Sequence, residues 1–334
     1  MPKRKPHYDS LQRRKRLYRD RVVGRNPSDK DKSIEITEAD LVQFEKHYLH
    51  GPLDTLRTHC HVKHLRPNFN THQKRQTKLY NGVFVKPDHI FYLEWPEQQQ
   101  ASLMMRSQYF VYDNGERALE ALDFRGRLPD LAPMERTDPM RHRYYNACTI
   151  SDIEYFAKDH GIDFISRFDI LGDGRTPEMT RKSSEPLLLP MKLHPNRKSI
   201  IPDDLFGLNY GGPKRFFVHE NDLGNEQHKA SAKTTTIEDK WTAYIEAIET
   251  GLFQKHWGIP KALVLTTTDS ATRANRMKKD LSRLTEHRPS LRAFFLFKVL
   301  PHLGEPYWKV PPLMPELLSQ PWDTLAGPVF INKI

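Results

Sequence analysis

Cysteine and long apolar runs are both scarce in this sequence. Only Cys60 and Cys148 occur among 334 residues, which excludes the disulfide framework of small secreted domains. No segment approaches the roughly 18 apolar residues that a membrane-spanning helix needs. The first residues, Met1–Lys5, lack the apolar region of a secretory signal. We therefore expect a cytoplasmic protein with no membrane partner and with about two domains.

Acidic residues are scarce at the start of the chain. Residues 1–32 contain four Asp and no Glu against twelve Lys and Arg, so they carry +8 of the net charge of +10. Such a basic arm is typical of an extension that contacts a phosphate backbone, and a solubilising tail without a specific partner is the alternative. The densest part of this arm, and its candidate DNA contacts, are Arg13, Arg14, Lys15 and Arg16.

Residues 33–122 predict a small DNA-binding domain. Helical patterns occur at 37–48, near 53–56, at 71–80 and again at 116–122, and β-type segments occur at 83–93 and 108–112. Three helices followed by a hairpin predict a winged helix-turn-helix domain, with a small helical packing module as the alternative.

The helix at 71–80 is polar and cationic on nearly every side, so we do not expect it in a core. A helix of this kind is suited to the major groove of DNA. The side chains expected to face DNA are Gln73, Lys74, Arg75 and Lys78.

The second half of the chain alternates between helix and strand. Prolines among charged residues predict a linker at 123–140, and 141–300 then reads helix, three strands, helix, strand, helix, strand. The expected segments are 151–160, 164–168, 200–208, 214–219, 234–250, 261–266, 269–284 and 292–299. This order predicts an α/β (α+β) domain whose mixed central sheet is covered by helices. Residues 301–334 contain seven prolines and predict an extended tail on the surface.

Two neighbouring strands of this domain carry carboxylates at the same end. Glu220 and Asp222 are two residues apart, so they share a face of their strand. Asp203 lies at the matching end of the neighbouring strand, across a hairpin. Oxygen ligands of this kind are those that Mg²⁺ prefers, and phosphoryl oxygens complete its shell. We therefore expect a Mg²⁺ (or Mn²⁺) site with Asp203 and Glu220 as ligands.

The helix after these strands adds a cation. Lys240 and Tyr244 are one turn apart and face the strand ends together, where a lysine stabilises developing charge. The catalytic candidates are therefore Asp203, Glu220, Asp222 and Lys240. The alternative is that the strand-end carboxylates Asp203, Asp204 and Glu220 only form ion pairs with Lys214 or Arg215.

Three motifs carry a resemblance to a known family. They are Tyr109–Leu119, Ile201–Asp204, and Phe217–Asp222 with Lys240 and Tyr244. Residues 33–298 thereby resemble the replication-relaxation family of plasmid, conjugative-element and phage proteins. The resemblance implies a winged helix followed by a domain similar to the PD-(D/E)xK, or restriction-endonuclease-like, nucleases.

The resemblance also implies roles for individual residues. Asp203 and Glu220 would hold the metal, and Asp152 or Glu154 of the first helix would assist. Asp222 departs from the nuclease pattern, which usually has lysine there, and Lys240 would substitute from the helix.

The expected function is that of a bacterial cytoplasmic protein, belonging to a plasmid, phage or conjugative element, that binds double-stranded DNA in replication or relaxation, with metal-dependent nicking or cleavage. A non-catalytic replication or transcription regulator, using a degenerate nuclease fold to contact DNA, is the alternative. A homodimer on a palindromic site and contacts with other replication or mobilisation proteins are further expectations.

A second resemblance is weaker. His59 and His61, together with Tyr155 and Lys158, are similar to the His-x-His and Tyr-x-x-Lys motifs of rolling-circle initiators and relaxases, where a tyrosine attacks DNA. Those histidines would have to lie on a buried strand, yet their neighbours are charged. We expect solvated histidines beside DNA instead. A zinc site is disfavoured because a second pair of ligands is missing.

Overall fold

The computed structural model describes residues 34–82, 84–87, 111–128, 140–191, 199–223, 237–304 and 310–333. The chain divides into two compact units: unit 1 comprises 1–128 with 306–310, and unit 2 comprises 129–305 with 311–334. None of the described helices is long and apolar enough to cross a membrane. The basic arm, with Arg13, Arg14, Lys15 and Arg16, lies outside the described residues, as do positions 88–110 of the predicted hairpin.

Unit 1 combines helices with a small sheet. Its described elements are α2 (Glu38–His50), β1 (Leu53–Asp54), α3 (Thr55–Val62), α4 (Phe69–Asn81), β2 (Val85–Pro87), β3 (Val111–Asn114) and α6 (Glu116–Phe124). The strands pair antiparallel in the order β1-β3-β2. Phe44, Leu79, Tyr80 and Leu122 belong to its apolar core.

Helix α4 has a buried face, contrary to the prediction from its polar sequence. Its buried side chains are His72, Gln76, Leu79 and Tyr80. Gln76 accepts a hydrogen bond from Nε2 of Gln43 (3.0 Å) and donates to the hydroxyl of Thr58 (3.3 Å). Polar side chains that satisfy one another in this way can be buried without a large penalty, and a hydropathy pattern does not reveal them.

Unit 2 is built on a five-stranded mixed sheet of order β4-β5-β6-β7-β8. The strands are β4 (Asp163–Ile165), β5 (Asp204–Asn209), β6 (Lys214–Asp222), β7 (Leu263–Thr268) and β8 (Phe295–Val299). The first three pair antiparallel, and β6, β7 and β8 run parallel. The prediction of a mixed α/β class is confirmed.

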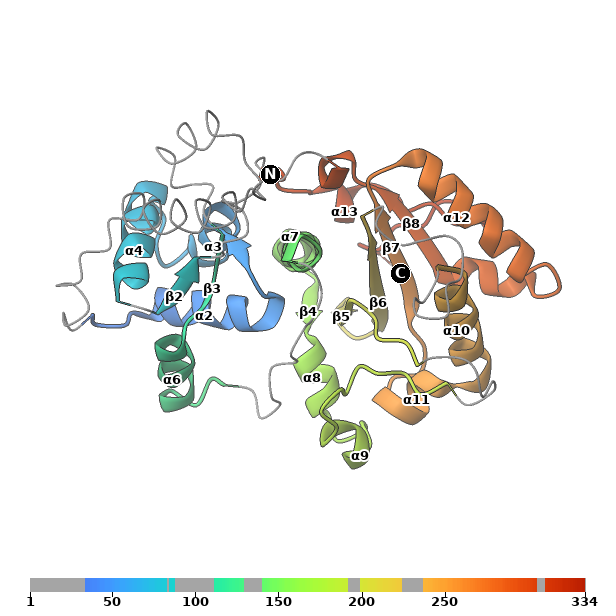
Figure 1. Ribbon diagram of the computed structural model, residues 1–334, viewed down its shortest axis with the longest axis horizontal. Coiled ribbons are helices and arrows are strands. Elements are labelled where there is room, and N and C mark those ends of the chain that lie inside the picture. The colour runs from blue at the N-terminus through green and yellow to red at the C-terminus, as the bar shows by residue number, and fades with distance from the viewer. Residues whose placement is uncertain are drawn as a thin grey trace, which may run out of the picture. The chain divides into compact units, whose positions relative to one another are not determined.

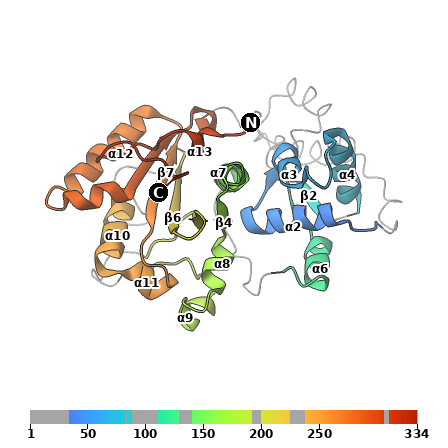
Figure 2. The same cartoon turned by 180° about the vertical axis from the view of Figure 1, so that it is seen from behind.

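Helices cover both faces of this sheet (Figures 1 and 2). One face carries α7 (Met140–Asp159), and the other carries α10 (Ile237–Thr250) and α12 (Ala271–Leu284). Phe216 and Val218 of β6 pack with Trp241 and Met277 on the α10 and α12 face. Smaller helices complete the unit: α8 (Arg167–Gly172), α9 (Glu178–Arg181), α11 (Leu252–Trp257), η4 (Pro289–Phe294), η5 (Pro301–Gly304) and α13 (Glu316–Ser319).

The predicted boundaries of unit 2 need three corrections. Helix α7 begins at Met140, so the expected linker at 123–140 overlaps the end of α6 and the first residue of α7. The strand expected at 164–168 ends at Ile165, because Ser166 and Asp169 form a capping box that starts α8. The first part of the segment 292–299 is the 3₁₀ helix η4 rather than strand.

The C-terminal segment is packed into unit 2 and is not an extended surface tail. Its buried side chains include Met314, Leu317, Leu318, Trp322 and Ile331. The backbone of Asp323 pairs with that of Phe297 in β8 (2.8 and 3.0 Å), and Nε1 of Trp322 donates to the carbonyl of Leu317 (2.8 Å). The prediction of an extended tail rested on the seven prolines of this segment. Its composition does not show that the apolar residues between them are buried.

Candidate functional site

The predicted carboxylates meet at one edge of the sheet in unit 2. Glu220 and Asp222 end β6 and alternate with residues of the opposite face, so both point toward α10 and α12. Asp203 immediately precedes β5, and its backbone N–H donates to the carbonyl of His219 (3.0 Å). The hairpin expected between the two strands is present and brings Asp203 beside Glu220.

Glu220 is held by two residues of α10. Nζ of Lys240 donates to Oε2 (2.8 Å), and the hydroxyl of Tyr244 donates to Oε1. The side chain is buried. Burial raises the pKa of Glu220 to about 7, with a contribution from the charge of Asp203, although Lys240 acts in the opposite direction. The prediction that Lys240 and Tyr244 face the strand ends together is confirmed.

Asp203 has a different electrostatic environment. Its Oδ2 accepts the backbone N–H of Asn221 (2.7 Å), and Nε2 of His142 lies 2.9 Å from its Oδ1. Burial would raise the pKa of Asp203, but the charge and hydrogen bond of His142, the charge of Lys240 and the Asn221 N–H together hold it below its ordinary value. The site therefore contains one carboxyl that ionises readily and one that resists ionisation.

Asp222 faces an arginine instead of a lysine. Nε and Nη2 of Arg273, from α12, donate to its two carboxylate oxygens (2.9 and 2.6 Å). Asp204 is bound by Arg167 (2.9 and 3.1 Å). The alternative paired Asp203, Asp204 and Glu220 with Lys214 or Arg215. The ion pairs seen among the described residues are instead those of Asp203 with His142, Asp204 with Arg167 and Glu220 with Lys240. Each partner comes from a helix that packs on the sheet.

The opposite face of β6 carries a chain of buried polar groups. Nδ2 of Asn146, in α7, donates to the carbonyl of Asp203 (3.1 Å), so its Oδ1 faces Nδ1 of His219 (2.7 Å) and accepts from it. Nε2 of His219 lies 2.9 Å from the hydroxyl of Thr267, which also contacts Oδ1 of Asn221 (3.2 Å). These hydrogen bonds fix α7 to the strands that carry the carboxylates.

Two residues of α7 at the site were missed by the sequence reasoning. His142 and Asn146 are four residues apart, so they lie on one face of the helix, and both contact Asp203. That spacing could have indicated them had the start of α7 been placed correctly. The resemblance offered Asp152 or Glu154 instead. Asp152 lies about 15 Å further along α7 and accepts the backbone N–H of Met314 (3.0 Å).

Two buried hydroxyls lie on the same face as the carboxylates. Thr266 and Thr268 of β7 are in register with Glu220 and Asp222. Both are buried, and their Oγ1 atoms have no hydrogen-bond partner among the described residues. Buried hydroxyls without a protein partner are typical of places where water or a ligand binds. Together with two buried carboxylates, they give a set of oxygen donors that fits Mg²⁺ or Mn²⁺.

The predicted DNA contacts on α4 separate into two kinds. Lys74 and Lys78 are exposed and Gln73 is half-buried. Arg75 instead donates through Nε and Nη2 to the carboxylate of Asp40 (3.1 and 2.5 Å), a fully buried residue. Arg75 therefore ties α4 to the start of α2, and its expected role as a DNA contact is corrected to a structural one.

The histidine run does not have the geometry that the rolling-circle resemblance requires. His59, Cys60 and His61 lie in helix α3 rather than on a strand, and Tyr155 lies on α7 in the other unit. His61 and Cys60 are also buried, so the expectation of solvated histidines is wrong for this part of the run. Of the three, only His59 is partly exposed.

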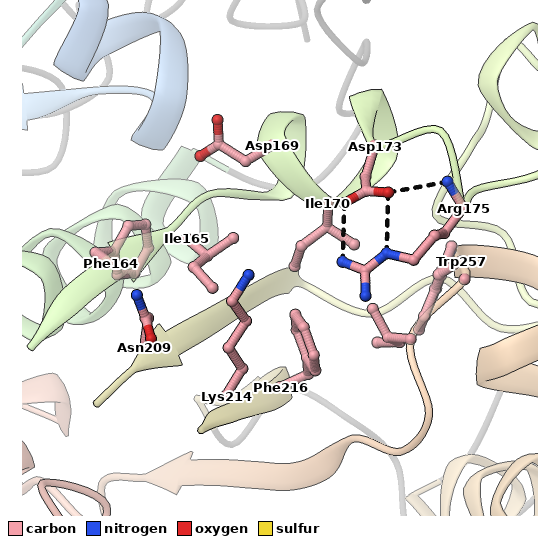
Figure 3. Close-up of a pocket in the computed structure, with 12 residues that line it drawn as sticks. Phe164, Ile165, Asp169, Ile170, Asp173, Arg175, Asn209, Lys214, Phe216 and Trp257 are labelled. Atoms are coloured by element: carbon pink, nitrogen blue, oxygen red, sulfur yellow. Dashed lines mark hydrogen bonds and ion pairs between the residues drawn. The ribbon is translucent and has the colours of Figure 1, made fainter. Parts of the chain in front are cut away.

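A separate pocket of about 280 Å³ lies at the other end of the β5–β6 hairpin (Figure 3). Its floor is apolar, with Phe216 and Trp257, and Arg175 at its rim binds Asp173 through both carboxylate oxygens. Phe216 precedes Glu220 by four residues, or roughly 13 Å along the strand. The pocket contains none of the predicted site residues.

Comparisons with protein-family models, with curated proteins and with solved structures find no match to this chain. The contacts around Asp203 and Glu220 are therefore the basis for a functional proposal.

Proposed function

We propose that this protein binds double-stranded DNA and nicks or cleaves it with a divalent metal, in the cytoplasmic replication or relaxation of a plasmid, phage or conjugative element. The observation that carries the proposal is the convergence of Asp203, Glu220 and Lys240 at one sheet edge. Two buried carboxylates beside a lysine are a costly arrangement for stability alone, because each charge loses its hydration. Such groups are typical of functional sites.

The topology of unit 2 supports a nuclease-like domain. Helix α7, the antiparallel strands β4, β5 and β6, helix α10 and the parallel strand β7 occur in this order, with α8 and α9 inserted between β4 and β5 and α11 before β7. Without these insertions the order is that of the core of the PD-(D/E)xK nucleases that the sequence resembles. Asp203 immediately precedes the second strand and Glu220 lies near the end of the third, at the edge where the parallel strands end. Crevices at the carboxyl ends of strands are common ligand sites in α/β sheets.

Each residue of the site has a role in this proposal. When bound, Mg²⁺ or Mn²⁺ polarises the phosphoryl group and lowers the pKa of an attacking water. Asp203 and Glu220 would hold the metal, and Tyr244 orients the Glu220 carboxylate. Lys240 would place a positive charge where the phosphodiester gains negative charge. Asp222 would position Arg273 near the same edge.

The order of elements in unit 1 supports a winged-helix reading. A strand lies between the first two helices, and the third helix is followed by β2 and β3, which pair antiparallel. The exposed side of α4 presents Lys74 and Lys78, with Gln73 beside them, to a DNA groove. The basic arm would add contacts to the phosphate backbone.

Replacing Lys74 or Lys78 with alanine will weaken binding to duplex DNA. Each replacement will also reduce the magnitude of the slope of log K against log salt by about 1, because one fewer counterion is released from the DNA on binding. Alanine at Arg75 will instead destabilise unit 1 by about 1–3 kcal/mol, because Asp40 loses a charged donor. Fluorescence anisotropy across a salt series and urea unfolding measure the two effects. A stable Arg75→Ala protein that binds DNA as poorly as Lys74→Ala would contradict this assignment.

The nuclease proposal is tested by incubating purified protein with supercoiled plasmid in Mg²⁺, Mn²⁺ or EDTA. We expect conversion to open-circular or linear DNA that requires metal and is lost in Asp203→Asn. Thr180→Ala serves as a control because Thr180 contacts His256 away from this edge. Plasmid that stays supercoiled under all conditions would refute cleavage.

A non-catalytic regulator is the second candidate. It is favoured by Asp222, which stands where the nuclease pattern usually has lysine and is bound by Arg273. Intact plasmid that nevertheless shifts on a gel in a salt-sensitive way would support this candidate. The nuclease-like unit would then act as a DNA-binding scaffold.

A further inference from the structure

The pocket in Figure 3 has the size and the lining of a small-molecule site. Its volume of about 280 Å³ is close to the lower end of the range for ligand pockets, so it suits one small molecule. Apolar side chains from β4, α8, β6 and the end of α11 line it, namely Ile165, Ile170, Phe216, Trp257 and Ile259. Two of these are aromatic, and aromatic side chains favour contact with another ring.

The wall of the pocket beside Arg175 is held in place by close contacts. Gly258, the C-cap of α11, has a φ of +70°, and a Cβ there would lie 2.5 Å from the backbone carbonyl of Arg175. The hydroxyl of Thr176 lies 2.8 Å from the carbonyl of Ile170 and 2.7 Å from that of Trp257. These contacts join the turn after α8 to the end of α11, so the pocket is formed before a ligand binds.

The carboxylates beside the pocket already have donors. Nε and Nη2 of Arg175 donate to the two carboxylate oxygens of Asp173 (3.0 and 2.8 Å), so these two residues form a neutral pair. Oδ2 of Asp169 accepts from the backbone N–H and the hydroxyl of Ser166 (2.8 and 2.6 Å). Figure 3 shows this carboxylate turned away from the other lining side chains. Neither carboxylate therefore needs a cation from the opposite side of the pocket.

Lys214 supplies that opposite side with a positive charge. It is the first residue of β6, and its side chain shares a face of the strand with that of Phe216. Figure 3 shows its amine between Ile165 and Ile170, and this ammonium group forms no hydrogen bond or ion pair with the residues that the structure describes. Its charge contributes to the lowered pKa of Asp173 only after the hydrogen bonds and the charge of Arg175. Lys214 is thus positioned to bind an anion within the pocket.

We propose that this pocket binds a small planar aromatic anion, with its ring on the apolar lining and its anionic group on Lys214. A charge-assisted hydrogen bond from a lysine to a carboxylate or a phosphate is a strong contact, and a ring beside Phe216 adds buried apolar area. Aromatic carboxylates and mononucleotides both have this chemistry. The inference does not rest on the proposed nuclease function, because the pocket shares no residue with the carboxylate edge.

The location of binding is measured on the full-length protein without metal or DNA. The probes are dAMP and salicylate, each compared with its uncharged counterpart, deoxyadenosine or salicylamide. Spectra of the isoleucine δ1 methyl groups show where a probe binds, because Ile165, Ile170 and Ile259 line the pocket. Ile153 is the internal control, since it is buried in α7 and does not line the pocket.

The contribution of the charge is measured by calorimetry on variants. The proteins compared are the wild type, Lys214→Met, Lys214→Glu and Lys255→Met. Lys214 is exposed, so both of its variants should fold. Lys255→Met is the matched control, because Lys255 is an exposed lysine of α11 that does not line the pocket.

We expect dAMP, salicylate or both to shift the methyl signals of Ile165, Ile170 and Ile259 and to leave that of Ile153 unchanged. Affinity should fall about fivefold or more in Lys214→Met, fall further in Lys214→Glu, and stay within about twofold in Lys255→Met. The uncharged counterpart should bind more weakly than its anion. Binding of dAMP alone would identify a nucleotide site, and binding of salicylate alone a site for an aromatic carboxylate.

Three results would overturn the inference. They are pocket methyl signals that neither probe shifts, an affinity that is unchanged in both Lys214 variants, and an uncharged counterpart that binds as tightly as its anion. Each is distinct from failure of the proposed function, which is measured by plasmid conversion. A protein that leaves plasmid intact but binds dAMP or salicylate through Lys214 retains this pocket as a ligand site.

Discussion

Glutamine in place of Glu220 will reduce metal-dependent nicking by about 100-fold or more, because a metal ligand is worth several kcal/mol of transition-state stabilisation. Glutamine keeps the shape of the side chain: its carbonyl oxygen can accept from Lys240, and its amide nitrogen can donate to the hydroxyl oxygen of Tyr244. Rates of plasmid conversion at saturating Mn²⁺ and Mg²⁺ measure the effect. Lys240→Met is expected to lose a similar factor, since it removes the charge that stabilises the developing negative charge.

Unfolding cannot account for this loss. The pKa of Glu220 is raised to about 7 in the folded protein, mainly by burial, from an ordinary value of 4.5. The native state therefore binds more protons than the unfolded chain between these values, and the stability that the carboxyl contributes is present below pH 4.5 and lost as the pH rises through 7. Glutamine does not ionise, so the Glu220→Gln variant does not lose stability as the pH rises through 7. Urea unfolding at pH 7.5 should therefore show a variant at least as stable as the wild type.

The matched control is Asp222→Asn on the same strand and face. Both oxygens of Asp222 accept from Arg273, so we expect its replacement to change nicking by less than about tenfold. A variant at Asp222 that is as inactive as Glu220→Gln would show that the metal site extends along β6. A Glu220→Gln protein that still nicks DNA at the wild-type rate would remove Glu220 from the site.

Acid will destabilise unit 1 before it destabilises unit 2. Burial lowers the pKa of His47 to about 4 and that of His72 to about 3. Asp40, which faces His72 from α2, also has a lowered pKa because Arg75, the Thr37 N–H and Arg66 outweigh its burial. The charge of Arg66 and that of the neighbouring His59 further disfavour protonation of His72.

The direction of the effect follows from proton binding. Below pH 6.5 the unfolded chain binds protons at His47 and His72 that the native state excludes, so stability is present above that pH and lost as the pH falls toward 4 and 3. Between pH 7 and pH 5, protonation of these two histidines in the unfolded chain would lower the free energy of unfolding of unit 1 by about 2–4 kcal/mol. In unit 2, the raised pKa of Glu220 increases stability as the pH falls over this range. The lowered pKa of His256 offsets part of this increase in stability.

Native-state hydrogen exchange, corrected for the intrinsic pH dependence of amide exchange, measures each unit separately. Peptides from α2 and α4 should lose protection at pH 5 relative to pH 7.5, and peptides from β5 and β6 should not. The double variant His47→Gln with His72→Gln should flatten the pH dependence, since glutamine does not titrate. Equal loss of protection in both units would contradict this prediction.

The parts of the site that the sequence revealed are those that depend on short-range geometry. Glu220 and Asp222 share a face because strand residues alternate, and Lys240 and Tyr244 share one because a helical turn spans about four residues. The hairpin at 209–212 then fixes which residue of the neighbouring strand lies beside them. These rules act within a few residues, so they can be applied to the sequence without knowledge of distant contacts.

Other features depended on contacts between distant segments. The partner of Asp203 is His142, 61 positions earlier in the chain, and it could be found only once α7 was known to begin at Met140. Arg75 was predicted to contact DNA because no acidic partner lies near it in the sequence. Its partner, Asp40, is 35 residues away. A pattern of polarity does not distinguish a cation paired inside a protein from one that is exposed to solvent.

The alternation along β6 also has an evolutionary consequence. His219 and Asn221, on the face toward α7, form hydrogen bonds with Asn146 and Thr267, whereas Glu220 and Asp222 form ion pairs on the other face. Replacing the buried Glu220 relieves an unfavourable burial rather than damaging the core. Under the proposed nuclease function, a lineage released from selection for cleavage would thus lose Glu220 early and keep its architecture. Intact scaffolds with a neutral residue at this position are the expected remnants of such a loss.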